Sequence, residues 1–401
     1  MRKAAENYGL LFCGSGRKGL TDKTSTLRDV LQVSLVIPTR NEADTICECI
    51  QRAQQVLRDT GLEGEILVAD SSSDETAKIA ASCGAKVVNP QKLGYGNAYL
   101  AGFEKAEGEY IVLMDGDLTY DPAAIRDMVA ILQSGNYDMV MGSRLKGEIL
   151  PGAMPALHRY IGNPVLTWIL NTLFSSSISD AHCGLRAITK DALKKLNLRS
   201  GGMEFASEML IEAVCKDLRI AEVPITYSPR RGKSKLHSFT DGWRHVRFMM
   251  LYRPVPFLLV PGLLVLLFGL VLSAGVYLQG GSRVHSLILG GLLLIIGYQM
   301  LLAGLYFEAF GASYGLSHQG RIKRMISYHS LEKELFVGMI LLAVGVLLGL
   351  KVMLSWGASG FGALDAASSA MMAMIFCILG IQTIFSGMFM SLLLLNNGLQ
   401  E

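Results

Sequence analysis

Hydrophobic positions follow two different patterns along this chain. Up to about residue 250, short apolar runs alternate with longer segments of helical spacing, whereas four later segments stay apolar almost throughout. Those segments lie at about 255–278, 285–309, 335–356 and 368–395. A helix of about 20 apolar residues spans the roughly 30 Å hydrocarbon layer of a bilayer, and soluble core helices rarely stay apolar for that length. We therefore predict a multi-pass membrane protein whose all-α transmembrane domain, residues 255–401, has four spans.

The region before the spans alternates strand and helix patterns. Strand-like runs occupy VSLVIPT (33–39), GEILVAD (64–70), AKVVNP (85–90) and EYIVLMD (109–115). Helical spacing follows the first three at 40–57, 71–84 and 92–106, with Ser72 or Ser73 as a cap for the second. This alternation is typical of a parallel sheet covered by helices on both faces. We predict an α/β domain at 33–235, a polar tail at 1–32 before it and an amphipathic interfacial helix at 236–254 after it.

Basic residues indicate the orientation in the membrane. The segment before the first span carries Arg230, Arg231, Lys233, Lys235, Arg244, Arg247 and Arg253, and the connection between spans two and three carries Arg321, Lys323, Arg324 and Lys333. The other two connections hold Arg283 alone. Because Lys and Arg are enriched in cytoplasmic loops, we predict that both termini and the α/β domain are cytoplasmic. The net charge of +3 is too small to indicate a nucleic acid partner.

Cysteine spacing gives no sign of a metal site or a redox motif. The seven cysteines include no C-x-x-C pair and no zinc-like spacing. Cys47 and Cys49 lie in a helical pattern, and Cys377 lies in an apolar run. We predict reduced thiols, as is usual in the cytosol.

Polar residues follow three of the predicted strands, at 38–42, 70–74 and 115–117. Ligands of such sheets bind beyond the carboxyl ends of the strands, so we expect the three clusters to meet at one edge. Asp115 and Asp117 can share one Mg²⁺ or Mn²⁺ together with substrate phosphates. Solvated turn residues are the simpler explanation of an isolated Asp-x-Asp, but three converging loops favour a nucleotide diphosphate site.

Seven ordered motifs together resemble family 2 glycosyltransferases with the GT-A (Rossmann-like) fold. More narrowly, they are similar to dolichyl-phosphate mannose synthases and polyprenyl-phosphate glycosyltransferases. The motifs, within residues 33–250, are VSLVIPTRNE, VADSSSDET, KLGYGNAYLAGF, YIVLMDGDLTYDP, VMGSR, SDAHCGLRA and EVPITY…RRGKSKL. The resemblance implies a GT-A nucleotide-sugar domain followed by a transmembrane domain of four helices.

The resemblance also implies roles for matching positions. Asp115 and Asp117 would bind the metal ion and bridge it to the donor diphosphate. The nucleotide-sugar site would comprise Pro38, Arg40, Glu42, Asp70, Gly94, Asp115, Arg231 and Lys235. The lipid phosphate would be bound by Ser143, Arg144 and Arg186. The catalytic set would be Asp117, Asp180, Arg144 and Arg186.

Three positions leave alternatives open. The arginine of the family's R-x-x-G-x-S-K motif falls at Pro229, so we expect Arg231 or Lys235 to close on the diphosphate. Ala69 stands where the family often has the first of two acids, which leaves recognition of the base open. Gly94 either lets the backbone approach a ligand or simply forms a turn.

A lipid monophosphate acceptor simplifies the expected chemistry. Its second pKa is about 6, so its oxygen is already anionic near pH 7 and no strong general base is needed. Arg144 and Arg186 can grip that phosphate bidentately, and the metal ion stabilises the leaving nucleoside diphosphate. Asp180 would orient a group or balance charge, and a structural cap on Arg186 is its alternative role.

Two segments have the mixed character of helices that lie in the headgroup plane, at 157–176 and 239–254. Each combines basic residues with aromatic and aliphatic ones. A core helix with one wet face is the alternative for both.

We predict an inverting, metal-dependent hexosyltransferase that uses GDP-mannose or UDP-glucose and a polyprenyl or dolichyl phosphate at the cytoplasmic membrane face. Its partners are the donor, the lipid acceptor and the bilayer, and the spans are candidates for a homo-oligomer contact. One alternative is a membrane glycosyltransferase that makes a glycolipid or polysaccharide on a hydroxyl acceptor, although the Q-x-x-R-W string that processive enzymes share does not occur. A non-catalytic membrane scaffold is the other alternative. No residue decides between the two sugars.

Overall fold

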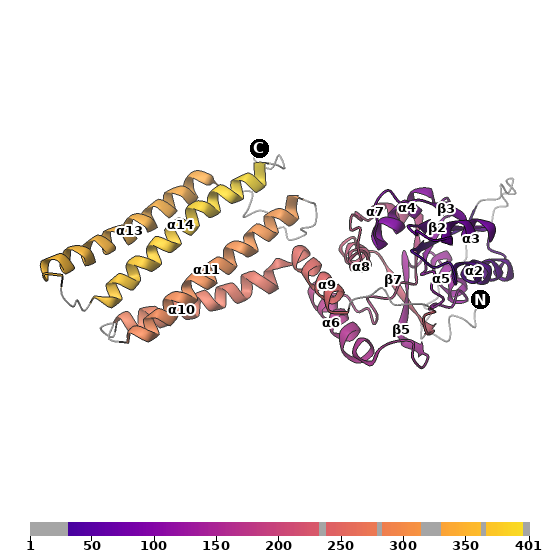
Figure 1. The fold of residues 1–401 in the computed structure, drawn as a ribbon, viewed down its shortest axis with the longest axis horizontal. Coiled ribbons are helices and arrows are strands. Elements are labelled where there is room, and N and C mark those ends of the chain that lie inside the picture. Colours follow the sequence, from indigo (N-terminus) through magenta and orange to yellow (C-terminus); the bar gives the residue numbers. More distant parts are fainter. Residues whose placement is uncertain (1–30, 232–237, 279–282, 314–329, 362–365, 396–401) are drawn as a thin grey trace, which may run out of the picture. The chain divides into compact units, whose positions relative to one another are not determined.

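The computed structural model describes residues 31–231, 238–278, 283–313, 330–361 and 366–395. The chain forms two compact units, and the division falls after Val246, inside helix α9 (Ser238–Tyr252). The first unit is an α/β domain and the second is helical, as the ribbon shows (Figure 1). Most of the predicted tail, and Lys235 of the predicted site, lie outside the described residues.

A seven-stranded sheet in the order β3-β2-β1-β4-β6-β5-β7 forms the centre of the first unit. Its strands are β1 (Val33–Thr39), β2 (Gly64–Asp70), β3 (Lys86–Val88), β4 (Tyr110–Leu113), β5 (Met139–Ile149), β6 (Arg186–Thr189) and β7 (Ile220–Tyr227). The first four pair in parallel, as predicted. Strand β6 departs from the predicted parallel sheet, because it runs antiparallel to both β4 and β5.

The reversed strand β6 has a consequence for the site. Arg186 at its start pairs in register with Leu113, the last residue of β4, and with Met141 of β5. The loop that precedes β6 therefore lies at the edge where β4 ends and where the carboxylates 115–117 follow. A parallel strand would have placed that loop at the opposite edge.

Helices cover both faces of the sheet. They are α2 (Ile46–Thr60), α3 (Thr76–Ser82), α4 (Tyr95–Lys105), α5 (Ala124–Gln133), α6 (Asn163–Phe174), α7 (Lys190–Lys195) and α8 (Phe205–Cys215), with the π-helical turn η1 (His158–Gly162) before α6. Leu35 and Ile37 of β1 pack into one core cluster with α2 and α5. On the other face, a Cβ at Gly102 of α4 would lie 2.3 Å from Val36 Cγ1, so this glycine lets α4 approach the sheet closely.

Two predicted helix starts differ from the structure. The helix expected from residue 40 begins at Ile46, because residues 40–45 form the loop after β1. Helix α3 has Glu75 at its N-cap without a side-chain cap bond, so the predicted caps Ser72 and Ser73 are wrong. Ser72 instead bonds to Asn41 in the loop after β1 and to Asp70 at the end of β2, and Ser73 bonds to Asn41.

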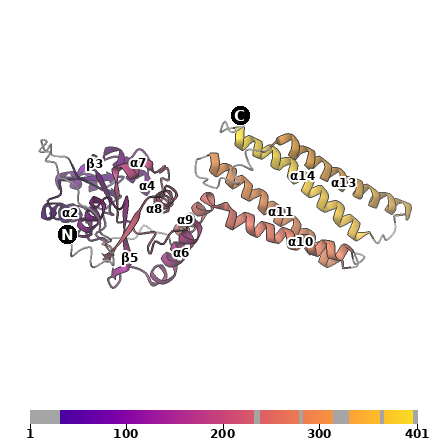
Figure 2. The ribbon, with the colours of Figure 1, turned by 180° about the vertical axis from the view of Figure 1, so that it is seen from behind.

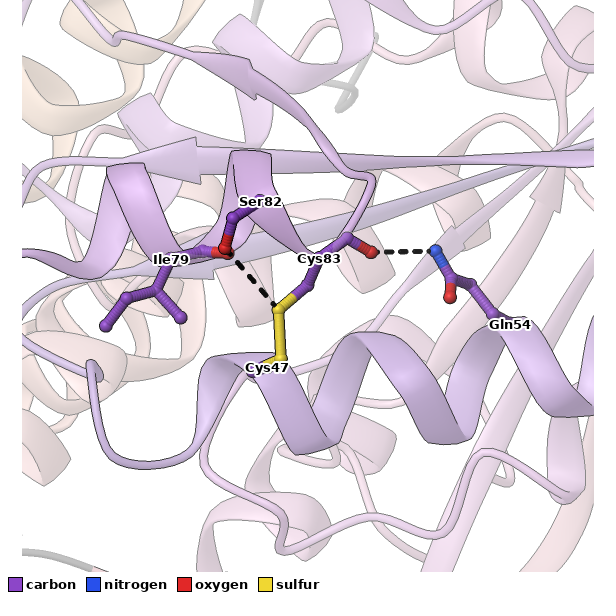
Figure 3. Close-up of a disulfide and its surroundings, with 5 residues drawn as sticks. All are labelled: Cys47, Gln54, Ile79, Ser82 and Cys83. Atoms are coloured by element: carbon purple, nitrogen blue, oxygen red, sulfur yellow. Dashed lines mark hydrogen bonds between the residues drawn. A yellow bond between two sulfur atoms is a disulfide. The ribbon is translucent and has the colours of Figure 1, made fainter.

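A disulfide joins Cys47 in the first turn of α2 to Cys83 at the end of α3 (Figure 3). The two Cα atoms are 5.8 Å apart although the residues are 36 positions apart in sequence. The carbonyl of Cys83 also accepts a hydrogen bond from Gln54 of α2, at 3.0 Å. The prediction of reduced thiols is therefore wrong for this pair, since the fold of two helices on one sheet face brings the sulfur atoms together.

The second unit contains four helices long and apolar enough to cross a membrane, as predicted. They are α10 (Val260–Leu278), which follows the π-helical turn η2 (Val255–Leu259), α11 (Val284–Ser313), α13 (Leu331–Ala358) and α14 (Ala367–Leu395). Figures 1 and 2 show α10 beside α11 and α13 beside α14. Small residues allow this contact: a Cβ at Gly297 would lie 2.4 Å from Leu266 N, and one at Gly380 would lie 2.5 Å from Leu342 N. The orientation in the membrane and a homo-oligomer contact stay predictions.

Candidate active site

Asp115 and Asp117 lie directly after β4, held by separate neighbours. The Tyr95 hydroxyl donates to Asp115 Oδ1 at 3.0 Å. The backbone N–H and the hydroxyl of Thr119 both donate to Asp117 Oδ1, at 3.1 and 2.6 Å. Oxygen Oδ1 of each carboxylate is thus oriented by the protein.

The electrostatics of this pair suit a divalent cation. Burial and the nearby charge of Asp117 raise the pKa of Asp115 from its ordinary 3.8 to about 7. A cation between the two oxygens would relieve the repulsion that raises this pKa. Within the described part of the chain, no group of three or more His, Cys, Asp or Glu side chains is placed to hold a metal. Two carboxylates suit Mg²⁺ or Mn²⁺ in chemical type, since these ions often bind through one or two carboxylates together with substrate phosphates and water.

Arg230 is the basic residue that lies against these carboxylates. Its Nη2 is 2.8 Å from Glu42 Oε1, and its buried Nε is 3.4 Å from Asp117 Oδ2. The predicted Arg231 instead pairs at the surface with Glu48, at 2.6 Å, and its side chain is 62% exposed. The structure thus places Arg230 beside the carboxylates, a residue that the sequence analysis did not choose because the family's motif is shifted here, and the contact of Arg231 with the diphosphate stays a prediction.

The loops after β1 and β2 are bonded to each other. Thr39 Oγ1 donates to Asp70 Oδ1 at 2.7 Å, and Asn41 N donates to Ser72 Oγ at 2.7 Å. Asn41 has the left-handed φ of 54°. Asp70 is buried in this contact and also accepts a bond from the Ser72 hydroxyl. The predicted nucleotide residues therefore lie at the bonded ends of β1 and β2, with Pro38 and Asp70 in the strands and Arg40 and Glu42 in the loop after β1.

The structure explains why a glycine stands at position 94, which the sequence left open. Its φ is 141°, and a Cβ there would lie 2.1 Å from the carbonyl oxygen of Gly201. Its carbonyl accepts the first bond of α4, from Ala98 N. In this structure the glycine is needed for contact with the chain at residue 201, and its predicted contact with the donor stays untested.

Arg144 and Asp180 form the second half of the site. Arg144 Nε lies 2.7 Å from Asp180 Oδ2, Nη2 lies 2.8 Å from Oδ1, and the Arg144 backbone N–H also donates to Oδ2. The guanidinium lies over the Tyr227 ring, 5.2 Å from its centroid. Ser143, also predicted here, bonds to Ser179 Oγ at 2.6 Å. Asp180 is 0% exposed, so it orients Arg144 and is not presented to solvent as a base.

Arg186, predicted as a phosphate ligand, is bonded to the main chain in this structure. Its guanidinium is 2% exposed and donates to three main-chain carbonyls: Cys183 at 2.9 Å, Ala206 at 2.7 Å and Ala181 at 3.0 Å. These bonds tie the loop before β6 to the start of α8. Arg186 therefore braces this loop, and Asp180 caps Arg144 rather than Arg186, whereas the contact of Arg186 with a lipid phosphate stays a prediction.

A chain of contacts connects the two halves. The backbone N–H of Gly184 donates to the Tyr120 hydroxyl at 2.8 Å, and the Tyr120 and Tyr227 rings lie 5.4 Å apart. A Cβ at Gly184 would lie 2.8 Å from Asp115 Oδ2. The carboxylate pair and the Arg144 pair therefore belong to one packed region. The sequence analysis gave neither tyrosine a role, although Tyr120 and Tyr227 stand inside the motifs YIVLMDGDLTYDP and EVPITY.

Helix α6 and the turn η1 expose an apolar face on the first unit. The exposed residues are Leu157, Tyr160, Ile161, Val165 and Trp168, with Trp168 66% exposed. The opposite face buries Thr167, Leu170 and Phe174. In the other predicted interfacial helix, α9, Trp243 is exposed and Met249 is buried. Helix α6 therefore combines a packed face with an exposed apolar face.

Two segments of the chain match known sequence families. Residues 34–196 match the family described as Glycosyl transferase family 2. Residues 305–394 match the Glycosyltransferase family 2 C-terminal transmembrane region. The matches fall in the α/β unit and in the helical unit, respectively.

Individual proteins are similar over different shares of the chain. The low-salt glycan biosynthesis hexosyltransferase Agl6 of Haloferax volcanii is 42% identical over 362 residues, which cover 88% of this chain and 87% of the relative. A dolichyl-phosphate hexose transferase of the same organism is 30% identical, over 52% of this chain and 89% of the relative. Among solved structures, glucosyl-3-phosphoglycerate synthase from Mycobacterium tuberculosis, in complex with Mn²⁺, UDP-glucose and glycerol 3-phosphate, has a TM-score of 0.45 and 21% identity, over 55% of this chain and 79% of that chain.

Proposed function

Because this chain belongs to glycosyltransferase family 2, we propose that it transfers a hexose from a nucleotide sugar to a dolichyl or polyprenyl phosphate. The names of the two Haloferax relatives support the hexose, and the name of the second supports the lipid phosphate. The observation that carries the proposal is the packed region that joins the Asp115–Asp117 pair to the buried Arg144–Asp180 pair. One half suits a donor diphosphate with its cation, and the other half suits an anionic acceptor.

The donor half needs positive charge on both sides of the diphosphate. Asp115 and Asp117 would hold Mg²⁺ or Mn²⁺, which would supply charge neutralisation for the leaving nucleoside diphosphate. Tyr95 and Thr119 keep the two carboxylates oriented. Arg230 lies close enough to Asp117 to contact a phosphate bound to the same ion. The proposed donor is GDP-mannose or UDP-glucose, since the diphosphate and its cation are common to both.

The acceptor half needs a fixed cation and no strong base. A phosphate monoester is largely dianionic above its second pKa of about 6, so its oxygen is already a nucleophile. Arg144 is the guanidinium that we assign to this phosphate, since Asp180 holds it in one orientation and Arg186 is engaged by carbonyls. Direct attack on the anomeric carbon from the face opposite the diphosphate would invert the sugar linkage.

The uncovered face of η1 and α6 supports delivery of the acceptor from the bilayer. Its tyrosine and tryptophan are residues favoured at the headgroup level, and Arg159 stacks over the Tyr160 ring at 5.4 Å. We propose that this face lies in the headgroup plane on the cytoplasmic side of the membrane. The acceptor phosphate then remains at the level of the headgroups while its polyprenyl tail stays in lipid.

The test is lipid-dependent transfer by the purified full chain. Protein in detergent with Mn²⁺ is incubated with labelled GDP-mannose or UDP-glucose, each with dolichyl phosphate or with dolichol as the matched control. We expect labelled lipid only with dolichyl phosphate and loss of the product with EDTA. Equal transfer to dolichol would indicate a hydroxyl acceptor, and no labelled lipid from either donor would remove the proposed function.

A further inference from the structure

Two histidines and a serine form a cluster beside the acceptor half of the site. His245 Nδ1 of α9 lies 2.8 Å from Ser207 Oγ of α8, and His182 Nε2 lies 3.4 Å from the same oxygen. The two imidazole rings meet edge to face, with centroids 4.6 Å apart. Ser207 is fully buried and His245 is 7% exposed. Ser207 and His245 are therefore enclosed by protein, whereas His182 is half-buried with its Nδ1 atom covered.

His182 belongs to the loop that sets the acceptor residues. Two positions before it, Asp180 holds Arg144 through both carboxylate oxygens. The carbonyls on either side of it, of Ala181 and Cys183, accept bonds from Arg186. A shift of the His182 ring would therefore be transmitted along a short segment to the carboxylate that orients Arg144.

The hydrogen bonds of the cluster require a defined arrangement of protons. The Ser207 hydroxyl has one proton, so it donates to one imidazole and accepts an N–H from the other. Burial, together with the charges of His245, Arg144 and Arg186, holds the pKa of His182 well below its usual range, so its ring is neutral. Its Nδ1 is buried and makes no hydrogen bond within the described residues. The orientation of this ring thus depends on Ser207 and on ring contact with His245.

An enclosed polar cluster is a costly way to fill space. Polar groups lose their bonds to water on burial, and an unpaired one costs more than an apolar group of the same shape. In return, directional hydrogen bonds select one orientation where apolar packing allows several. The cluster also contains a residue of α9, the helix that continues along the chain toward the first membrane-spanning helix.

We propose that Ser207 and His245 hold His182 as a positioning residue, so that the loop at 180–183 presents Arg144 to the acceptor phosphate. This inference rests on the proposed function, because it assigns the lipid phosphate to Arg144. His182 acts through Asp180 and Arg144 and does not itself touch the reacting atoms. The expected signature is a change in acceptor affinity with no change in donor affinity.

The test uses pairs of variants that differ in one hydrogen bond. His182→Leu and His245→Leu keep the bulk of the side chain and remove its polar atoms. His182→Gln retains a polar group near the position of Nε2, and His245→Asn retains one near the position of Nδ1. Each leucine variant is expected to raise the KM for dolichyl phosphate about fivefold to tenfold, the loss that one hydrogen bond implies. The KM for the nucleotide sugar should stay unchanged, and each amide variant should recover most of the acceptor affinity.

Binding without turnover separates this inference from the proposed function. The Kd of dolichyl phosphate is measured in the absence of donor for the wild-type chain and for Ser207→Ala, which removes the shared hydroxyl without adding bulk. Weaker binding of dolichyl phosphate by this variant, with an unchanged Kd for the nucleotide sugar, supports the positioning role whether or not the melting temperature falls. Unchanged acceptor KM and Kd in all variants, or equal effects on donor and acceptor, would overturn it. If the wild-type chain binds the lipid but forms no product, the proposed transfer is wrong. The Kd values of the variants then still decide whether the histidine cluster positions Arg144.

Discussion

Asp180 holds Arg144 through both of its carboxylate oxygens, at 2.7 and 2.8 Å, and is itself completely buried. Such a pair contributes little net stability compared with an apolar pair, but removal of one partner leaves a buried charge without compensation. The buried pair therefore maintains one orientation of the guanidinium. A solvent-exposed aspartate would not hold it in this way.

Asp180→Asn is expected to reduce both stability and acceptor use. The variant keeps the shape of the side chain but leaves the Arg144 charge uncompensated, which should lower the free energy of unfolding by about 3–5 kcal/mol. Denaturant unfolding and the KM for dolichyl phosphate measure the two effects. Asp138→Asn is the matched control, because Asp138 pairs with Arg219 at the surface and should cost about 0–1 kcal/mol. Equal losses for both variants would contradict the role of the buried pair.

Asp117→Asn tests the cation site. An amide oxygen can still accept the bonds from Thr119, so the fold should be retained, whereas the charge that binds the metal is lost. We expect the rate of transfer to fall about 100-fold or more, because a bound metal ion contributes several kcal/mol of charge stabilisation to the transition state. Titration of Mn²⁺ in the presence of the nucleoside diphosphate should show weaker binding. Wild-type metal affinity in this variant would show that the ion binds elsewhere.

The raised pKa of Asp115 predicts two effects of pH. Between its ordinary pKa of 3.8 and about 7, the folded metal-free protein holds a proton that the unfolded chain has lost. The stability that the protonated Asp115 contributes to the folded state is therefore fully present below pH 3.8 and is lost as pH rises through about 7. Mn²⁺ competes with this proton, so its apparent affinity should weaken as pH falls below about 7. Metal titrations at several pH values measure the inflection, and Asp117→Asn should move it to lower pH.

Gly184→Ala should displace the Asp115 carboxylate. The added Cβ would lie 2.8 Å from Asp115 Oδ2 and 3.1 Å from the Tyr120 hydroxyl, which leaves no room without movement. We expect a loss of about 1–3 kcal/mol in stability, the usual cost of overpacking, together with a loss of transfer. Gly242→Ala in α9 is the control, because nothing lies within 4 Å of its Cβ position. Full activity of Gly184→Ala would show that the contact is not needed.

The disulfide should stabilise the first unit. It closes a segment of 36 residues, for which the chain-entropy estimate is about 3–4 kcal/mol. The double variant Cys47→Ser and Cys83→Ser should lose this amount in denaturant unfolding. Alkylation of unfolded, unreduced protein should modify neither cysteine of the pair. Complete alkylation without reductant would show free thiols.

The same bridge bears on the predicted orientation. Persistent disulfides are uncommon where thiols are kept reduced, whereas the basic connections predict a cytoplasmic α/β unit. A membrane-impermeant maleimide applied to the variant Lys78→Cys, whose native side chain is 79% exposed on α3, in sealed vesicles of known orientation, decides between the two sides.

The spacing of hydrophobic residues and the length of the apolar segments determined most of the architecture. Strands β1 and β2 were predicted with their observed bounds because a β-branched run between turn residues is a local signal. The four membrane helices followed from hydrophobic length alone. The carboxylate pair followed from its position after a buried strand, since strand ends of a parallel sheet share one edge.

Only the tertiary structure decided which charged groups meet. The direction of β6 brings the loop at 180–185 to the carboxylate edge, and no local pattern specifies strand direction. Arg230 rather than Arg231 reaches Asp117, and Arg186 bonds to main-chain carbonyls. The direction of each side chain depends on how it packs against segments that are distant in the sequence. The disulfide and the histidine cluster likewise join residues 25 to 38 positions apart. Contacts at such separations depend on how whole helices and strands pack against each other. The local order of residues in one segment does not determine that packing.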